Sequence, residues 1–228
     1  MFACRAIRLL GLACLLALGL VRPASADLML GLQFSEPGYA TYSVTGPIDP
    51  LIVVQNFGTF STNIEVNNVA TDPLSIDLGS LNLSSFAPGD LTVTASVTGL
   101  TAPLGSTSFL SQLSGNVSGY VNSVSLNTFL STANAMFGTD TPLASLTATS
   151  GPFATAQYSP QTTTAAPYGI TEVLNIKTSG VANVSVDAST TTAPEIDARS
   201  GGAAIALLVG LVGLLAERRR RPAPAVAA

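Results

Sequence analysis

Acidic side chains are the groups in this sequence best suited to chemistry. Asp72 and Asp77 bracket the stretch DPLSID, and Glu65 lies a short way upstream. Two carboxylates held across a cleft can hydrolyse a glycosidic bond, and carboxylate and carbonyl oxygens together can bind calcium. The chain contains no EF-hand loop or acidic repeat, and its spacing leaves open which carboxylates meet in space. A two-carboxylate hydrolase and a calcium site are therefore kept only as alternatives.

Histidine is absent from the chain. Its absence removes the Ser–His and Cys–His nucleophile pairs, imidazole metal ligands and the usual general base near neutral pH. Both cysteines, Cys4 and Cys14, lie in an N-terminal stretch that we expect to be removed, so the mature protein would have no disulfide and no thiol. We therefore expect a protein that is not an enzyme and that uses no metal and no cofactor.

Aromatic side chains are sparse, and tryptophan is absent. Many sugar-binding sites present a flat ring to the apolar face of a pyranose, because such rings bury a large area at low entropic cost. Here that role would fall to tyrosines, for instance Tyr39, Tyr42, Tyr120, Tyr158 and Tyr168. The pattern favours core or edge positions of a sheet for these residues over a binding platform.

Three Asn-x-Ser triplets occur, at Asn82, Asn116 and Asn183. Such triplets accept N-linked glycans in a eukaryotic secretory route. In a chain rich in both Ser and Asn, chance explains them better, and we assign them no function.

Charge is distributed unevenly along the chain. Basic residues cluster at the two ends, and Lys177 is the one basic residue between positions 27 and 192, a segment that holds ten Asp and Glu residues. Binding to nucleic acid needs a basic surface that neutralises phosphates. We therefore exclude nucleic acid as a partner and expect an acidic domain.

The N-terminus is typical of a secretory signal peptide. Arg5 and Arg8 precede an apolar run over residues 9–21, which is followed by the small-x-small pattern of Ala24 and Ala26. The run is shorter than the roughly 20 residues of a membrane span, and we predict cleavage after Ala26. A lipoprotein signal ending at Cys14 is the alternative, but it is disfavoured because Gly11 stands where such signals carry a large aliphatic residue.

The body is strand-rich, because apolar residues recur at every second position in several short runs and helical periodicity is missing. Turn signals such as Pro-Gly, Asp-Pro and Ser-Gly separate the runs. These patterns predict an all-β fold, an antiparallel β-sandwich of jelly-roll or immunoglobulin-like type, with about eight to eleven strands. The clearest predicted strands cover residues 40–46, 91–99, 170–178 and 181–189.

Four stretches of the body are harder to assign. Residues 114–127 fit either one long strand or two strands, and residues 126–138 are the one place where we allow a short helix. Residues 157–168 are typical of an exposed loop, and residues 187–197 of an extended linker that leaves the domain.

The C-terminal segment places an acidic motif, an apolar run and a basic block in that order. Residues 201–216 are uninterruptedly apolar, and as a helix they would span about 24 Å of a hydrocarbon core of about 30 Å. The basic block stays cytoplasmic by the positive-inside rule, which leaves the body outside the membrane. The residues that set this topology are Arg218, Arg219, Arg220 and Arg221.

The stretch APEIDARSGGAAIALLVGLVGLLAERRRR resembles a PEP-CTERM domain, in the variant whose motif reads Val-Pro-Glu-Ile-Asp. Ala193 replaces the usual Val, and seven residues follow the arginines. The resemblance implies processing by an exosortase in a Gram-negative bacterium that makes exopolysaccharide. Residues 166–186 also resemble the paired final strands of uncharacterised PEP-CTERM proteins. The residues that match the sorting motif are Pro194, Glu195, Ile196 and Asp197.

Together these features predict five parts. They are a signal peptide (1–26), a β-sandwich domain (27–188), a linker with the PEID motif (189–200), a transmembrane helix (201–217) and an Arg-rich cytoplasmic tail (218–228). We expect a non-enzymatic secreted or surface protein whose partners are an exosortase, the membrane and extracellular polysaccharide. The alternatives are a carbohydrate- or calcium-binding surface module and a simple membrane-anchored periplasmic domain.

Overall fold

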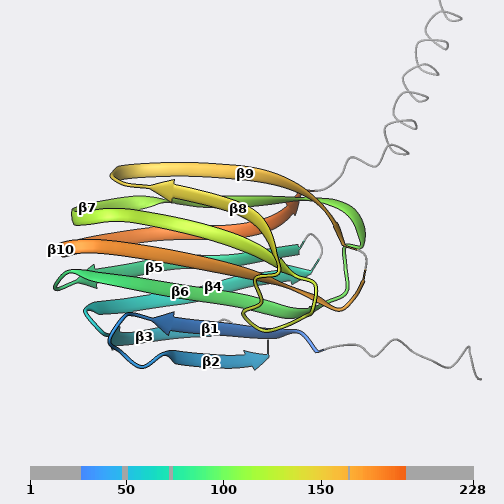
Figure 1. The fold of residues 1–228 in the computed structure, drawn as a ribbon, viewed down its shortest axis with the longest axis horizontal. Coiled ribbons are helices and arrows are strands. Elements are labelled where there is room, and N and C mark those ends of the chain that lie inside the picture. The colour runs from blue at the N-terminus through green and yellow to red at the C-terminus, as the bar shows by residue number, and fades with distance from the viewer. Residues whose placement is uncertain (1–26, 48–50, 72–73, 164, 194–228) are drawn as a thin grey trace, which may run out of the picture. The chain divides into compact units, whose positions relative to one another are not determined.

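The computed structural model describes residues 27–47, 51–71, 74–163 and 165–193, which form an all-β, antiparallel fold (Figure 1). This confirms the all-β, antiparallel part of the predicted fold class. The predicted signal peptide, PEID motif, transmembrane helix and Arg-rich tail lie outside the described residues. The described part of the chain contains no helix that is long and apolar enough to cross a membrane. The strands are β1 (Met29–Ser35), β2 (Tyr42–Pro47), β3 (Leu51–Phe57), β4 (Phe60–Thr71), β5 (Leu74–Ser85), β6 (Gly89–Leu100), β7 (Gly105–Ser131), β8 (Thr141–Ala148), β9 (Gly151–Thr163) and β10 (Tyr168–Ala193).

All ten strands belong to one hydrogen-bonded sheet, with the order β2-β1-β6-β10-β5-β4-β3 and with β7 joining β10 to β8 and β9. The two longest strands each serve two neighbours. In β10, residues 168–178 pair with β6 and residues 182–191 pair with β5. In β7, residues 105–117 pair with β9 and residues 124–130 pair with β8. We call these segments the first and second arms of β10 and of β7.

Both long strands bend sharply between their arms, and Figure 1 shows each of them doubling back at the same end of the molecule. A straight strand of 26 residues would extend about 85 Å. Gly119 at the bend of β7 has φ of +81°, a conformation that only glycine adopts readily. The bend of β10 falls at Ser179 and Gly180, where the sequence predicts a turn. The sheet therefore curls over on itself, which is consistent with a sandwich.

Apolar side chains from the two halves of the curled sheet meet in its interior. A large cluster draws on β1, β3, β4, β5, β6, β7, β8 and β10, and a smaller one includes Phe109, Leu130 and Ile170. In β10 every even-numbered residue from Tyr168 to Thr192 is buried except Gly180 at the bend, so the same period of two holds in both arms. The predicted strands at 91–99, 170–178 and 181–189 are found in β6 and in the two arms of β10, and β2 overlaps the predicted strand at 40–46.

A polar layer separates the two apolar clusters. Along their strands, inward-facing Ser111, Thr128 and Glu172 each lie between a residue of one cluster and a residue of the other, and inward-facing Thr190 follows Ala188 of the large cluster. Ser111 Oγ lies 2.8 Å from Thr128 Oγ1 and 3.4 Å from Thr190 Oγ1. Glu172 is 0% exposed, and among the described residues neither of its carboxyl oxygens has a hydrogen-bond partner of normal geometry.

Three expectations about the body are corrected by the structure. Residues 126–138 form no helix, because β7 continues to Ser131 and a loop follows. Residues 157–163 form a strand and not a loop, because β9 pairs with β7 over its whole length. Pro160 is tolerated there because β9 has no second neighbour among the described strands. The strand β10 runs to Ala193, five residues past the predicted end of the domain at 188, so residues 189–192 belong to the sheet.

The loop that replaces the expected helix covers the outer face of β1 and β6. The amide of Phe137 donates to Ser96 Oγ at 3.1 Å, and the amide of Gly99 donates to Asn134 Oδ1 at 2.7 Å. Gly31 on β1 lies beneath this loop, and a Cβ there would stand 2.5 Å from the sulfur of Met136. This cover explains why residues 93–100 of β6 are buried on both faces.

Candidate functional site

Of the acids singled out in the sequence, the structure brings Asp77 next to Asp187. Asp72 lies outside the described residues, and Asp187 of β10 stands opposite a β-bulge of β5 between Leu78 and Leu81. Burial raises the pKa of Asp77 to about 6, and the charge of Asp187 and a hydrogen bond shared with it act in the same direction.

No calcium cage is formed by the acids that the structure describes. Among the described residues, no group of three or more acidic side chains is placed to hold a metal ion.

Burial raises the pKa of Glu172 well above its usual value. The Thr190 hydroxyl beside it lowers that pKa, and Asp77 and Asp187 raise it further. The Glu172 carboxyl, which lies within the polar layer, therefore holds its proton to a higher pH than an exposed carboxyl does.

The five tyrosines do not gather into one platform. Tyr168 is in the core, where burial raises its pKa to about 12 and its hydroxyl donates to the carbonyl of Ala102 at 2.7 Å. The other four are exposed on separate elements. The ring of Tyr39 lies beside that of Phe57, with 6.5 Å between the two ring centroids. The ring of Tyr120 covers Gly180 at the bend of β10.

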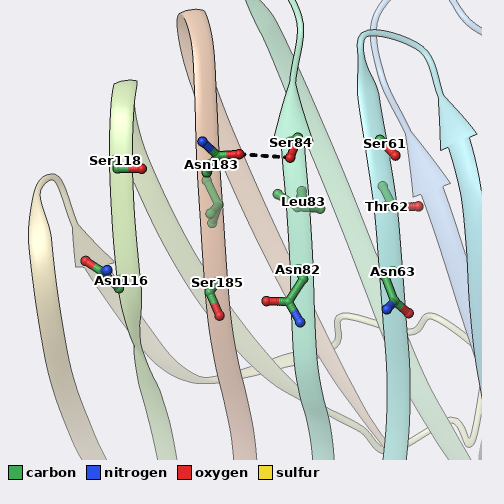
Figure 2. A pocket seen from close by; sticks show the side chains of 11 residues that line it. Ser61, Thr62, Asn63, Asn82, Leu83, Ser84, Asn116, Ser118, Asn183 and Ser185 are labelled. Carbon is green, nitrogen blue, oxygen red and sulfur yellow. Dashed lines mark hydrogen bonds between the residues drawn. The ribbon is translucent and has the colours of Figure 1, made fainter.

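The outer face of β4, β5, β10 and β7 carries the most regular set of polar side chains. Figure 2 shows them in two rows across the four strands, and they line a shallow hollow of about 350 Å³. Six of the eight are exposed, while the residues between them on the same strands, such as Leu83 and Val184, point into the core. We call this surface the Asn/Ser face, and its residues are Ser61, Asn63, Asn82, Ser84, Asn116, Ser118, Asn183 and Ser185.

Strand register builds the two rows. Ser84 is paired with Ser61 on one side and with Asn183 on the other. Asn82 is paired in the same way with Asn63 and Ser185. Figure 2 places Ser118 and Asn116 of β7 level with these rows. Each strand thus presents one amide and one hydroxyl, two residues apart, because side chains two apart in a strand share a face.

Most of the hydrogen-bonding capacity of this face is available for a ligand. Within the described part of the chain, one hydrogen bond joins two of its side chains, from Ser84 Oγ to Asn183 Oδ1 at 2.9 Å. An amide offers two donors and one acceptor oxygen, and a hydroxyl offers both functions. The face is neutral and can exchange hydrogen bonds with a hydroxyl-rich molecule.

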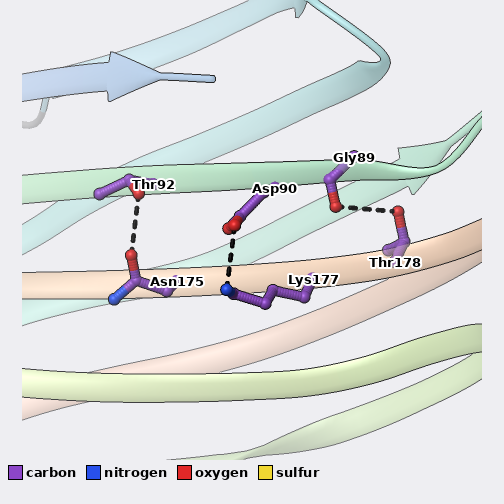
Figure 3. Close-up of polar contacts among 6 residues, drawn as sticks. All are labelled: Gly89, Asp90, Thr92, Asn175, Lys177 and Thr178. Carbon is purple, nitrogen blue, oxygen red and sulfur yellow. Dashed lines mark hydrogen bonds and ion pairs between the residues drawn. The ribbon is translucent and has the colours of Figure 1, made fainter. Parts of the chain in front are cut away.

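The outer face of β6 and the first arm of β10 differs, because its side chains pair with each other across the strands (Figure 3). Thr92 donates to Asn175 at 2.8 Å, and Lys177 lies 3.1 Å from Asp90, with the two side chains 55% and 41% exposed. A surface ion pair of this kind contributes about 0 to 1 kcal/mol. Two hollows of about 460 and 420 Å³ adjoin Lys177, but the internal pairs already use much of the local hydrogen-bonding capacity.

The Asn/Ser face contains the asparagines of all three Asn-x-Ser triplets, to which the sequence analysis assigned no function. A signal was present in the sequence. In a strand, Asn-x-Ser places the two polar side chains on one face and the middle residue on the other, and the middle residues are Leu83, Val117 and Val184. All three middle residues are buried.

The body is thus an acidic, all-β domain with a neutral polar face, and comparison with known proteins places a sorting signal after it. Residues 193–223 match the VPEID-CTERM protein sorting domain, as the resemblance in the sequence implies. The chain therefore carries a C-terminal segment that matches a VPEID-CTERM sorting domain. Such a domain implies an exported protein that is processed by a sorting enzyme. No curated protein matches the chain.

Solved structures resemble the body only distantly. An arabinose-bound α-L-arabinofuranosidase, MgGH51, aligns with a TM-score of 0.31 at 12% identity over 63% of this chain, which spans 23% of the arabinofuranosidase. TmCBM27, a carbohydrate-binding module described by its specific mannan recognition, aligns with a TM-score of 0.30 at 10% identity over 70% of this chain and 87% of the module. These TM-scores are too low to support any conclusion about the function of this chain.

Proposed function

We propose that this protein is a non-enzymatic surface or matrix protein that binds a neutral extracellular polysaccharide through the Asn/Ser face. One observation carries the proposal: eight amide and hydroxyl side chains from four strands share one solvent-open hollow. Neutral sugars are recognised through hydroxyl groups that donate and accept hydrogen bonds at once, and amides and hydroxyls match that pattern.

Charge favours a neutral polymer over an anionic one. The segment from residue 27 to residue 192 holds ten acidic residues and a single lysine, and that lysine pairs with Asp90. A body with this balance repels polymers of uronic acids or sulfated sugars. The Asn/Ser face itself carries no charge, so a neutral chain would bind there without an electrostatic penalty.

The route to the polysaccharide is part of the same proposal. The signal peptide would be removed after Ala26, residues 201–217 would hold the chain in the cytoplasmic membrane, and an exosortase would cut near Pro194 to Asp197. The released body would then reach the surface or the matrix of a Gram-negative cell. The sorting domain at residues 193–223 supports this route. In this proposal the curled sheet is a β-sandwich of jelly-roll or immunoglobulin-like type.

Two experiments test the proposal. The intact mass of the chain is measured in the producing strain and in a strain that lacks the exosortase; an unprocessed C-terminus at Ala228 in both would make it a simple membrane-anchored domain. Binding is then measured by calorimetry, with the exported chain purified from producing cells and the extracellular polysaccharide of the same strain.

The binding experiment has a defined variant and control. Replacing Asn63, Asn82, Asn116 and Asn183 by Ala removes up to four hydrogen bonds of about 0.5 to 1.5 kcal/mol each, so the Kd should rise at least about tenfold. Asn175→Ala, on the outer face of the first arm of β10, is the matched control and should leave the Kd unchanged. Unchanged binding by the fourfold variant, or no binding by the unaltered protein, would overturn the proposal.

A further inference from the structure

The hollow of the Asn/Ser face is longer across the strands than along them. It is lined by residues 61–63 of β4, 82–84 of β5, 183–185 of β10 and 116–118 of β7. Four strands spaced by about 4.8 Å extend over about 14 Å, whereas two outward positions of one strand are about 7 Å apart. An extended chain molecule fits such a hollow with its axis across the strands.

The chemistry of the face repeats with every strand. Each strand contributes one Asn and one Ser, at Ser61 and Asn63, at Asn82 and Ser84, and so on across the sheet. The strand spacing of about 4.8 Å is comparable to the length of one pyranose unit in an extended polymer. Each sugar unit would therefore meet one amide on one side and one hydroxyl on the other.

Carboxylates border the hollow along the strand direction. Beyond Ser185, the next outward residue of β10 is Asp187, whose carboxyl group neighbours that of Asp77. Asp187 lines a separate hollow of about 220 Å³ together with Gln112 and Ser114. At the other end of the hollow, β7 bends at Gly119 and β10 bends at Gly180. A chain that ran along the strands would pass over two acids at one end or leave the sheet at the other.

From these observations we propose that the polysaccharide crosses β4, β5, β10 and β7, with one sugar unit over each strand and about four units in the site. This inference rests on the proposed binding function and adds the direction and length of the bound segment. The ligand class is an extended, neutral polysaccharide, and Asp187 keeps acidic sugar units off the end of the face.

The test uses three single variants of the exported chain, each measured against the extracellular polysaccharide of the producing strain. Asn63→Ala and Asn116→Ala alter the two outer strands of the face, and Gln112→Ala alters β7 farther along the strand, in the neighbouring hollow. We expect the first two to weaken binding about three- to tenfold, as the loss of one hydrogen bond does. Gln112→Ala should bind like the unaltered chain.

Fragments of the same polysaccharide, sized from two to eight units after partial hydrolysis, measure the length of the site. Affinity should rise up to about four units and then level off. Weaker binding by Gln112→Ala, or normal binding by either outer variant, would refute the crossing direction even if the fourfold variant still loses binding. Normal binding by the fourfold variant would instead remove the proposed function and this inference with it.

Discussion

Glu172 provides the sharpest prediction, because it is a fully buried acid in the middle of the core. Its side chain is 0% exposed, and among the described residues neither carboxyl oxygen has a hydrogen-bond partner of normal geometry. Burial raises its pKa well above the usual value. The folded protein therefore keeps the Glu172 proton at a pH at which the unfolded chain has released it.

The sign of the effect follows from this difference in proton binding. Below the unfolded pKa of about 4.5, both states hold the proton and Glu172 has no influence on the pH dependence. Above it, the unfolded chain releases the proton and the folded chain does not, so stability falls by up to about 1.4 kcal/mol per pH unit until the raised folded pKa is reached. Glu172→Gln removes this contribution and should flatten the decline.

The assay is urea unfolding, followed by far-UV circular dichroism at half-unit steps from pH 4.5 to pH 8, with linear extrapolation to water. The quantity compared is the slope of the unfolding free energy with pH. Thr128→Val, in the same polar layer, is the control, because it removes a hydroxyl that does not titrate and should shift stability equally at every pH. Equal slopes for the unaltered protein and Glu172→Gln would refute the reasoning and would mean that Glu172 is ionised in the fold.

The other predictions concern Asp77, Gly119 and Glu36. Asp77→Asn should raise the free energy of unfolding at pH 7 by about 1 kcal/mol. A pKa near 6 implies up to about 3 kcal/mol, but the Asp77 carboxyl is partly solvated, which reduces the effect. The gain in stability should vanish below pH 4, and a gain that persists there would contradict its origin in the titration of Asp77. Gly119→Ala should lower the free energy of urea unfolding by at least about 1 to 2 kcal/mol, because φ is +81° and the new Cβ would stand 2.5 Å from a backbone oxygen of β10. An unchanged urea midpoint would contradict this and would show that the bend relaxes. Glu36→Ala should lower the free energy of urea unfolding by about 1 to 3 kcal/mol, since the Glu36 carboxylate accepts hydrogen bonds of 2.9 and 2.6 Å from the amide and hydroxyl of Thr59. Glu36→Gln keeps one acceptor and should recover part of this loss in the same assay.

The alternation of apolar and polar residues along the strands predicted most of the fold. The runs at 170–178 and 181–189 alternate so regularly that both arms of β10 were placed from sequence, and Ser179 and Gly180 marked the bend between them. The short helix allowed at residues 126–138 was wrong. Leu, Phe and Met there are spaced as on a helix, but the packing that decides the conformation comes from β1 and β6. Residues 157–163 misled because an edge strand tolerates proline and many exposed polar residues.

The Asn/Ser face was visible in the sequence only in pieces. Each Asn-x-Ser triplet could be interpreted as two outward side chains on a strand, but the neighbours of that strand are set by long-range pairing. Ser84 and Asn183 are 99 residues apart and still form a hydrogen bond. The two neighbouring carboxyl groups show the same limit, because Asp77 meets Asp187 through the register of β5 with β10 and the bulge in β5, which local spacing does not encode.

The end of β10 links the Asn/Ser face to the sorting domain. The second arm of β10 pairs with β5 and is joined to β7, so it is a central strand of the face, and its pairing with β5 continues to Thr191. Thr192 is buried, and its hydroxyl accepts a hydrogen bond of 3.1 Å from the amide of Leu74. Cleavage before Thr192 would expose unpaired strand at the middle of the sheet, whereas cleavage within the motif that begins at Pro194 leaves every described pairing intact. A mature C-terminus found upstream of Thr192 by intact mass would contradict this account, because the face could not then keep its central strand.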